Sequence, residues 1–191
     1  MKRMSLLIGA LATAALAGPP LICQKMEIGN ARSLPWTQAA AGWNGADPRY
    51  DLKALVSDTL EILTPATPIE VRMETIRRAA VYSVRKEGVA DRLLARLLAR
   101  AADSEAAEKA QASAWFDAGY FAEALRQMAF IGRYDTAEKA RWQWHGDYKG
   151  YDGKPWMERA VRLGAKGTET AFAKIEDMRL ADLRPPSVAK R

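Results

Sequence analysis

The sequence predicts an all-α fold in one domain. From Asp51 onward, apolar residues recur at the three- and four-residue spacing of amphipathic helices. No stretch alternates apolar and polar residues, and no hairpin turn lies between β-branched runs, so strands are not expected. The 191 residues, 49% of them hydrophobic, are enough to bury one core without disulfides or metals. We therefore predict a bundle of antiparallel helical hairpins over residues 51–184.

The N-terminal segment, residues 1–17, has the composition of a secretory signal peptide. Lys2 and Arg3 form a positive start, and Met4 to Ala17 carry no charge and end in small residues. This run is shorter than the roughly 20 residues that a membrane-spanning helix needs, and Gly18 and two prolines follow it. We therefore expect residues 1–17 to be removed and the protein to be exported to the periplasm or the extracellular space.

Cys23 is the only cysteine, so an intramolecular disulfide is impossible. A cysteine soon after a signal peptide can be acylated, but the residue before such a cysteine is normally small. Here that residue is Ile22, which is bulky and branched. The sequence thus favours a free or intermolecularly paired thiol, and contact with a membrane is expected only if Cys23 is acylated.

Residues 18–50 are predicted to be an irregular leader that packs on the helical body. They contain prolines and glycines and follow neither the strand period nor the helix period. Trp36 and Trp43 are expected to attach the leader, because two exposed indoles would leave a large apolar surface in water. At the other end, residues 185–191 are predicted to be a disordered tail.

The first two helices are bounded by prolines and by turn residues. An apolar stripe predicts a helix over residues 51–63, which Thr64-Pro65 ends. The next helix is expected to start at Thr67, with its hydroxyl as the N-cap, Pro68 at the first helical position and Glu70 completing the cap. Gly88 is expected to end that helix.

A third helix is predicted over residues 89–102, with leucines on one side and arginines on the other. Arg92, Arg96 and Arg100 lie four residues apart, as expected of a solvated face behind a core stripe. The alternative, a basic helix lying on a membrane, has the same spacing. Further helical patterns cover residues 104–118, 120–131, 134–144, 155–163 and 168–183.

A short pattern of a glycine, an aromatic residue and an alanine occurs twice. Gly119 is followed by Phe121 two residues on and by Ala124 five residues on, and the same spacing recurs from Gly132; a partial third copy begins at Gly146. Each glycine is expected to end a helix through a positive φ, and each alanine to allow close helix approach. The stretch 114–125 resembles a tetratricopeptide repeat, although the copies lie 13 residues apart and the match covers one repeat.

The resemblance implies stacked helical hairpins that bind a protein or peptide on an exposed face. The partial match carries over no binding residue. The layout of signal, leader and helical body also resembles secreted bacterial proteins with no assigned activity.

A cluster of aromatic residues over 142–156 is the candidate binding site. Aromatic rings with carboxylates on a glycine-containing loop can stack on sugar rings or clamp a peptide. Alternatively, Trp142 and Trp156 only anchor the ends of the loop. The candidate ligand-binding residues are Trp142, Trp144, His145, Tyr148, Tyr151, Asp152 and Trp156.

The sequence contains no motif for catalysis, for a cofactor or for a metal. His145 is the only histidine, so a metal site built mainly of imidazole and thiolate is excluded. An enzyme would need His145 with Asp147 or Asp152, or Glu123 with Asp117 as acid and base, and no motif supports either set.

The charge of the chain is mildly basic. It is +6, or +4 once Lys2 and Arg3 leave with the signal, and the arginines are spread over several helices, which argues against nucleic acid as the partner. We therefore predict a non-catalytic interaction module that binds a protein or peptide of the cell envelope. The alternative is a carbohydrate or peptidoglycan binder that acts through the loop 142–156.

Overall fold

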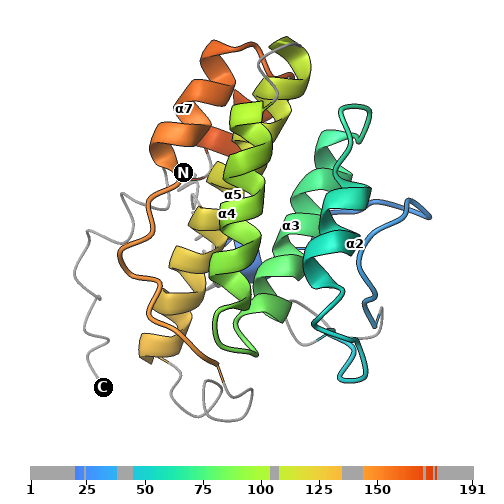
Figure 1. Ribbon diagram of the computed structural model, residues 1–191, viewed down its shortest axis with the longest axis vertical. Coiled ribbons are helices and arrows are strands. Elements are labelled where there is room, and N and C mark those ends of the chain that lie inside the picture. The colour runs from blue at the N-terminus through green and yellow to red at the C-terminus, as the bar shows by residue number, and fades with distance from the viewer. Residues whose placement is uncertain are drawn as a thin grey trace, which may run out of the picture.

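The computed structural model describes residues 20–23, 25–37, 45–103, 108–134, 144–169, 171–173 and 175. The predicted signal peptide and the predicted tail lie outside these residues. The described helices are α1 (Pro20–Cys23), α2 (Leu55–Ile62), α3 (Ile69–Ser83), α4 (Val89–Asp103), α5 (Glu108–Tyr134) and α7 (Lys154–Arg162), as Figure 1 shows. This part of the chain contains no strand, only an isolated bridge between Trp36 and Ala46. The prediction of an all-α fold is confirmed.

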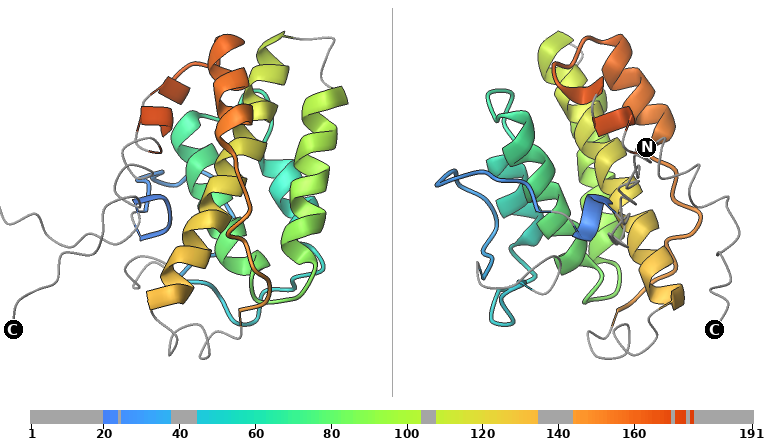
Figure 2. Two further views of the ribbon diagram at one scale, coloured as in Figure 1. Left: turned by 90° about the vertical axis from the view of Figure 1, so that its left-hand side faces the viewer. Right: turned by 180° about the vertical axis from the view of Figure 1, so that it is seen from behind.

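Helix α5 lies at the centre of the fold. It contacts α1, α3, α4 and α7, while α2 packs against α3 and α4. Figures 1 and 2 show α7 on one side of α5 and the pair α2 and α3 on the other. Small buried residues such as Ala118 and Ala122 allow close approach to α5, and the rings of Phe116, Tyr120 and Phe121 fill the spaces between helices. In the described part, no helix is long and apolar enough to cross a membrane.

The predicted helix end at Gly119 is wrong. Residues 108–134 form one continuous helix, so the expected helices 104–118 and 120–131 are not separate, and Gly132 also lies within α5. Gly119 is not among the glycines with positive φ. A Cβ on Gly119 would lie 2.7 Å from Cγ of Met157 and 2.9 Å from the carbonyl oxygen of Gly153, so its role is close packing between helices. The resemblance to tetratricopeptide repeats stays a prediction.

The predicted cap of the second helix is also wrong. Helix α3 begins at Ile69 and has no side-chain cap. The hydroxyl of Thr67 instead donates to the carbonyl oxygen of Ile62 at 2.6 Å and accepts from the amide of Thr64 at 2.9 Å. Thr67 therefore closes the end of α2 and leaves the first amides of α3 without a side-chain acceptor.

The other helix boundaries are closer to the prediction. Gly88 has a φ of +70° and directly precedes α4, but α3 already ends at Ser83, so Gly88 does not end that helix as expected. Helix α2 begins at Leu55, after a turn, and not at Asp51. Most of the predicted helix 134–144 and the end of the helix 168–183 lie outside the described residues, and Trp144 is not helical.

The leader packs on α3 and α5. Leu21 and Ile22 are buried; the amide of Leu21 donates to Oε1 of Gln127 at 3.1 Å, and Arg77 donates to the carbonyl oxygen of Ile22 at 3.1 Å. The ring of Trp36 covers the guanidinium of Arg77 at 4.6 Å. Trp43, the other expected anchor, lies outside the described residues.

Charged residues of α3 are buried together with its apolar face. Glu74 accepts hydrogen bonds at 2.7 Å from both Arg77 and Arg78 and at 3.0 Å from the amide of Met26. Burial alone would raise the pKa of Glu74, but these bonds and the attraction of Arg77 lower it below its usual value. The carboxylate therefore joins α3 to the leader.

We expect Gly153→Ala to destabilise the protein by about 1–3 kcal/mol, because an added methyl group would overlap the carbonyl oxygen of Gly119. Gly150→Ala is the matched control, since nothing lies within 4 Å of that position. Urea unfolding of both variants measures the difference. Equal midpoints would show that α5 and α7 do not approach as closely as described.

Candidate functional site

Part of the predicted aromatic site, residues 145–151, forms a segment that we call the strap. It lies against the C-terminal end of α3 and the N-terminal end of α4. The amide of His145 donates to the carbonyl oxygen of Val84 at 2.6 Å, and its side chain is exposed. Tyr148 is buried and donates its hydroxyl to the carbonyl oxygen of His145, while Tyr151 donates to the carboxylate of Asp91. The two tyrosine rings meet edge to face, with centroids 5.4 Å apart.

The remaining predicted residues lie on both sides of this strap. Asp152 is exposed and accepts from the amide of Lys154 at 3.1 Å. Trp144 and Trp156 are half-buried, and Trp142 lies outside the described residues.

The tyrosine hydroxyls of the strap are engaged by the protein itself. Burial raises the pKa of Tyr148 to about 12, and burial together with the bond to Asp91 raises that of Tyr151 further. Both tyrosine hydroxyls of the strap are therefore already hydrogen-bonded within the protein, and a ligand would meet mainly the partly covered rings. Sugar binding through this loop stays a prediction.

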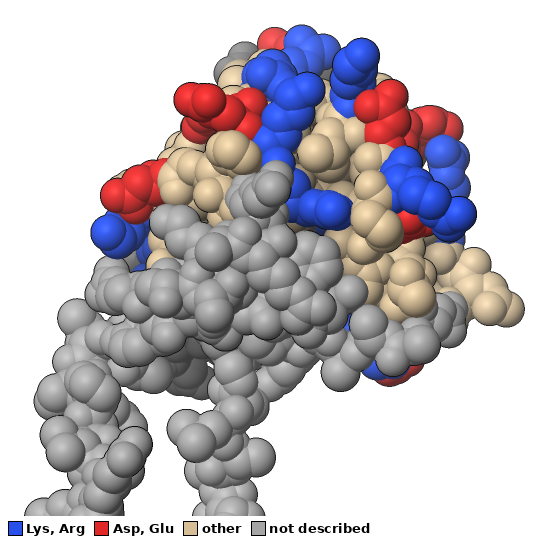
Figure 3. Space-filling view, turned by 90° about the horizontal axis from the view of Figure 1, so that it is seen from below, with Lys and Arg blue, Asp and Glu red and all other residues tan. Residues whose placement is uncertain are grey.

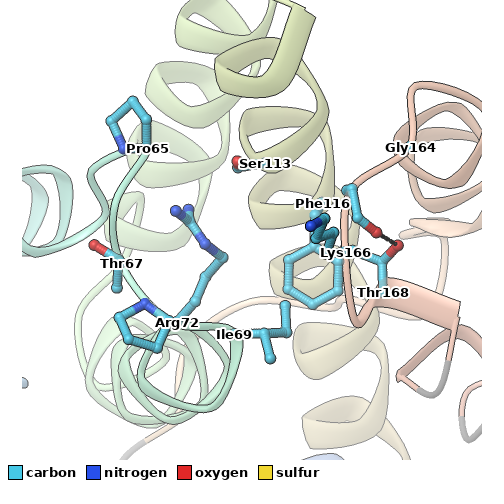
Figure 4. A pocket seen from close by; sticks show the side chains of 11 residues that line it. Pro65, Thr67, Ile69, Arg72, Ser113, Phe116, Gly164, Lys166 and Thr168 are labelled. Carbon is cyan, nitrogen blue, oxygen red and sulfur yellow. Dashed lines mark hydrogen bonds between the residues drawn. The ribbon is translucent and has the colours of Figure 1, made fainter.

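A pocket of about 400 Å³ lies elsewhere, at the N-terminal end of α3 (Figure 4). Three segments that are far apart in the sequence form it: the turn before α3, the first half of α5 and the chain after α7. Figure 4 shows the side chain of Arg72 pointing into the space between these segments. The lining residues are Pro65, Thr67, Pro68, Ile69, Arg72, Ser113, Phe116, Gly164, Ala165, Lys166 and Thr168.

Arg72, which lines the pocket, belongs to an ion pair with Asp117 that is buried between α3 and α5. Arg72 donates to Oδ2 of Asp117 at 2.5 Å and also to the carbonyl oxygen of Thr64. Only 4% of the Arg72 side chain and 1% of the Asp117 side chain are exposed. These two bonds leave further N–H groups on Arg72 for which the described residues provide no acceptor, and Arg72 lines the pocket.

Asp117 also faces a smaller cavity of about 40 Å³ that adjoins the pocket. Its second oxygen, Oδ1, is buried and has no hydrogen-bond partner in the described part of the chain. Burial raises the pKa of Asp117 to about 6, and the attraction of Arg72 and Arg100 only partly offsets this rise. The cavity is large enough for one water molecule, which needs about 10–15 Å³.

The carboxylates considered as catalytic acids and bases make other contacts in the fold. Glu123 accepts from Arg126 at 3.0 Å and from the amide of Gly153 at 2.8 Å, so it joins α5 to α7. Asp147 accepts from the amide of Lys149, two residues further along the chain. Among the described residues, no group of three or more histidine, cysteine and acidic side chains could bind a metal ion.

The sequence analysis missed the pocket. It considered Asp117 only as a possible acid, and it did not select Arg72, Ser113 or Lys166. The signal in the sequence that could have indicated the pocket was Arg72. It directly follows the core position Val71, whereas charged residues of a helix normally lie on its exposed face.

In the view from below, neither basic nor acidic side chains form a dominant patch on the described surface. In Figure 3, basic and acidic side chains alternate over the described part of that face. A long uniform basic track, as nucleic-acid binding requires, is not formed there.

No family model matches this chain, and no curated protein and no solved structure is significantly similar to it. The site is therefore interpreted from its own geometry.

We expect Asp117→Asn to remove a pH dependence of stability. The folded protein keeps the Asp117 proton up to about pH 6, whereas the unfolded chain releases it near 3.8. The stabilisation is thus complete below 3.8 and is lost as the pH rises through about 6, by about 3 kcal/mol.

The measurement is the free energy of unfolding of the wild type minus that of the variant, in steps between about pH 4 and pH 7. The exposed Ser57→Asn, which removes no titrating group, is the control and should leave a flat difference in this range. A flat difference for Asp117→Asn as well would contradict the raised pKa.

Proposed function

We propose that this protein is an exported, non-catalytic binding module and that the pocket at the start of α3 receives part of its partner. One observation carries this proposal: a guanidinium that is almost fully buried points into a pocket with otherwise mostly apolar walls. Ligand sites have this composition, since apolar walls supply burial and a few convergent polar groups fix the orientation of the ligand.

The size and the walls of the pocket support a compact ligand. Its volume of about 400 Å³ is within the usual range of roughly 300–1,000 Å³ for small-molecule sites. Ile69 and Phe116 form the apolar wall, and Lys166 brings a second cation to the rim.

The arrangement of consecutive helices supports an interaction module. Helices α2 and α3 are consecutive in the chain and in contact with each other. The same is true of α4 and α5, as in stacked hairpins. A protein or peptide of the cell envelope, as proposed from the sequence, would place one group in the pocket and rest on the neighbouring surface.

The position of α1 supports export with cleavage before Leu21 and opposes acylation of Cys23. Acylation would remove every residue before Cys23, including Leu21 and Ile22, which are at most 1% exposed. That loss would open the core and leave the bond from Arg77 to the carbonyl oxygen of Ile22 unmade. Cleavage after Ala17 would keep both residues.

We expect the exported protein to have the mass of a chain that begins at Gly18. The measurement is intact mass spectrometry of the protein purified from the periplasm or the medium of a bacterial host that expresses the full chain. Cys23→Ser is the control and should be exported with only the mass change of the substitution. An acylated N-terminal Cys23 in the wild type would overturn this part of the proposal.

We expect Ser113→Trp to abolish binding in the pocket, because an indole there would fill it. The probes are hexanoate, hexanamide and hexylamine, which share an apolar chain and differ in the charge of the head group. Amide resonances of residues around the pocket report binding, and the affinity of any bound probe should fall at least about tenfold, or about 1.4 kcal/mol.

Ser57→Trp on the exposed face of α2 is the matched control and should bind like the wild type. If none of the three probes shifts resonances of the pocket in the wild type, the proposed site is wrong.

A further inference from the structure

The pocket and the small cavity that adjoins it contain a cation with spare donors, Arg72, and an acid with a spare acceptor, Asp117. Arg72 uses two hydrogen bonds, to Asp117 and to the carbonyl oxygen of Thr64. Oδ1 of Asp117 has no partner in the described part, although the side chain is buried. A buried oxygen without a partner is costly, so a native structure normally satisfies it with water, a proton or a ligand.

We propose that the pocket binds a carboxylate that carries an apolar group, and that this binding takes up one proton on Asp117. This inference rests on the proposed function of the pocket and adds the class of the ligand and its coupling to pH.

The charges around the pocket favour an anion. Arg72 from α3, Arg100 from α4 and Lys166 from the chain after α7 line the two adjoining cavities. Asp117 on α5 is the only acidic residue among the described residues that line them. The first amides of α3 have no side-chain cap and lie at the same wall, where the helix dipole favours negative charge.

A carboxylate fits this arrangement better than a compact inorganic anion. The planar guanidinium of Arg72 can donate to both oxygens of a carboxylate. The wall of Ile69 and Phe116 covers an attached apolar group, which an inorganic anion lacks. Thr67 and Ser113 also line the pocket.

The proton follows from the proximity of two carboxyl groups. A ligand carboxylate on Arg72 lies beside Asp117, and two neighbouring carboxylates cannot both remain ionised at low cost. Asp117 therefore takes a proton from solvent. The protonated carboxyl group donates through Oδ1 to the ligand, and the ligand replaces Asp117 as the counter-ion of Arg72.

The experiment is calorimetric titration of the full exported protein with hexanoate at about pH 5.5 and about pH 7.5, where the ligand itself is largely ionised. We expect affinity to be higher at the lower pH, by on the order of twentyfold if only the protonated form of Asp117 binds. Titrations near pH 7.5 in buffers of different ionisation enthalpy should show uptake of close to one proton. Hexanamide, the neutral analogue, should bind weakly and without proton uptake.

Asp117→Asn gives a second test, because its amide resembles the protonated acid. This variant should bind hexanoate equally well at both pH values. The calorimetry of the wild type remains decisive if the variant does not fold.

The peptide N-acetyl-Ala-Ala-Leu, with a free or an amidated C-terminus, distinguishes the source of the carboxylate. Tighter binding of the free peptide than of hexanoate indicates a chain terminus, and binding of hexanoate alone indicates a free acid.

Other outcomes would overturn the inference, and they distinguish its failure from failure of the proposed function. Binding of hexanoate with equal affinity at both pH values and no proton uptake would refute the role of Asp117. Binding of hexanamide or hexylamine in preference to hexanoate would refute the ligand class while the pocket remains a binding site. Absence of binding by every probe would refute both the inference and the proposed function.

Discussion

Helix α3 is enclosed on nearly all sides, and its charged side chains must therefore find partners inside the protein. An ion left unpaired in the interior would cost several kcal/mol. Glu74 and Arg77 satisfy each other and bind the backbone of the leader, and Arg72 reaches across to Asp117 on α5. These contacts fix how α1, the leader and the central helix α5 sit around α3.

The charged residues of α3 differ in how completely they are satisfied. In the middle of the helix, Glu74 accepts from two arginines and one amide, and the ring of Trp36 covers Arg77. Near the N-terminal end, Arg72 keeps unused donors and Asp117 an unused oxygen, next to a pocket. The contacts of Glu74 and Arg77 join parts of the protein to one another, whereas Arg72 and Asp117 keep polar groups that a ligand could bind. This difference is the physical reason why we propose recognition at the start of α3 and not at the aromatic strap, whose tyrosine hydroxyls the protein already engages.

Sequence periodicity predicted the positions of α2, α3 and α4 to within a few residues, because an apolar stripe is a local property of the chain. Gly119 was misinterpreted because glycine serves two purposes that look alike in a sequence. It can end a helix, or it can let a second backbone approach, as Gly153 does here. Thr67 was misinterpreted for a similar reason, since its hydroxyl can cap the next helix or close the previous one.

The sequence by itself determined the helical class, the amphipathic character of α4 and the lack of known catalytic motifs, since each depends on neighbours along the chain. The tertiary structure alone decided which charges become buried pairs and where a pocket forms. Arg72 and Asp117 are 45 residues apart, and Lys166 comes from a third segment. No local pattern marks such partners, because the free energy of burying a charge depends on the groups that folding brings around it. For the same reason, the sequence offered Asp117 only as one member of a possible acid–base pair, whereas in the fold it is a buried group with a raised pKa.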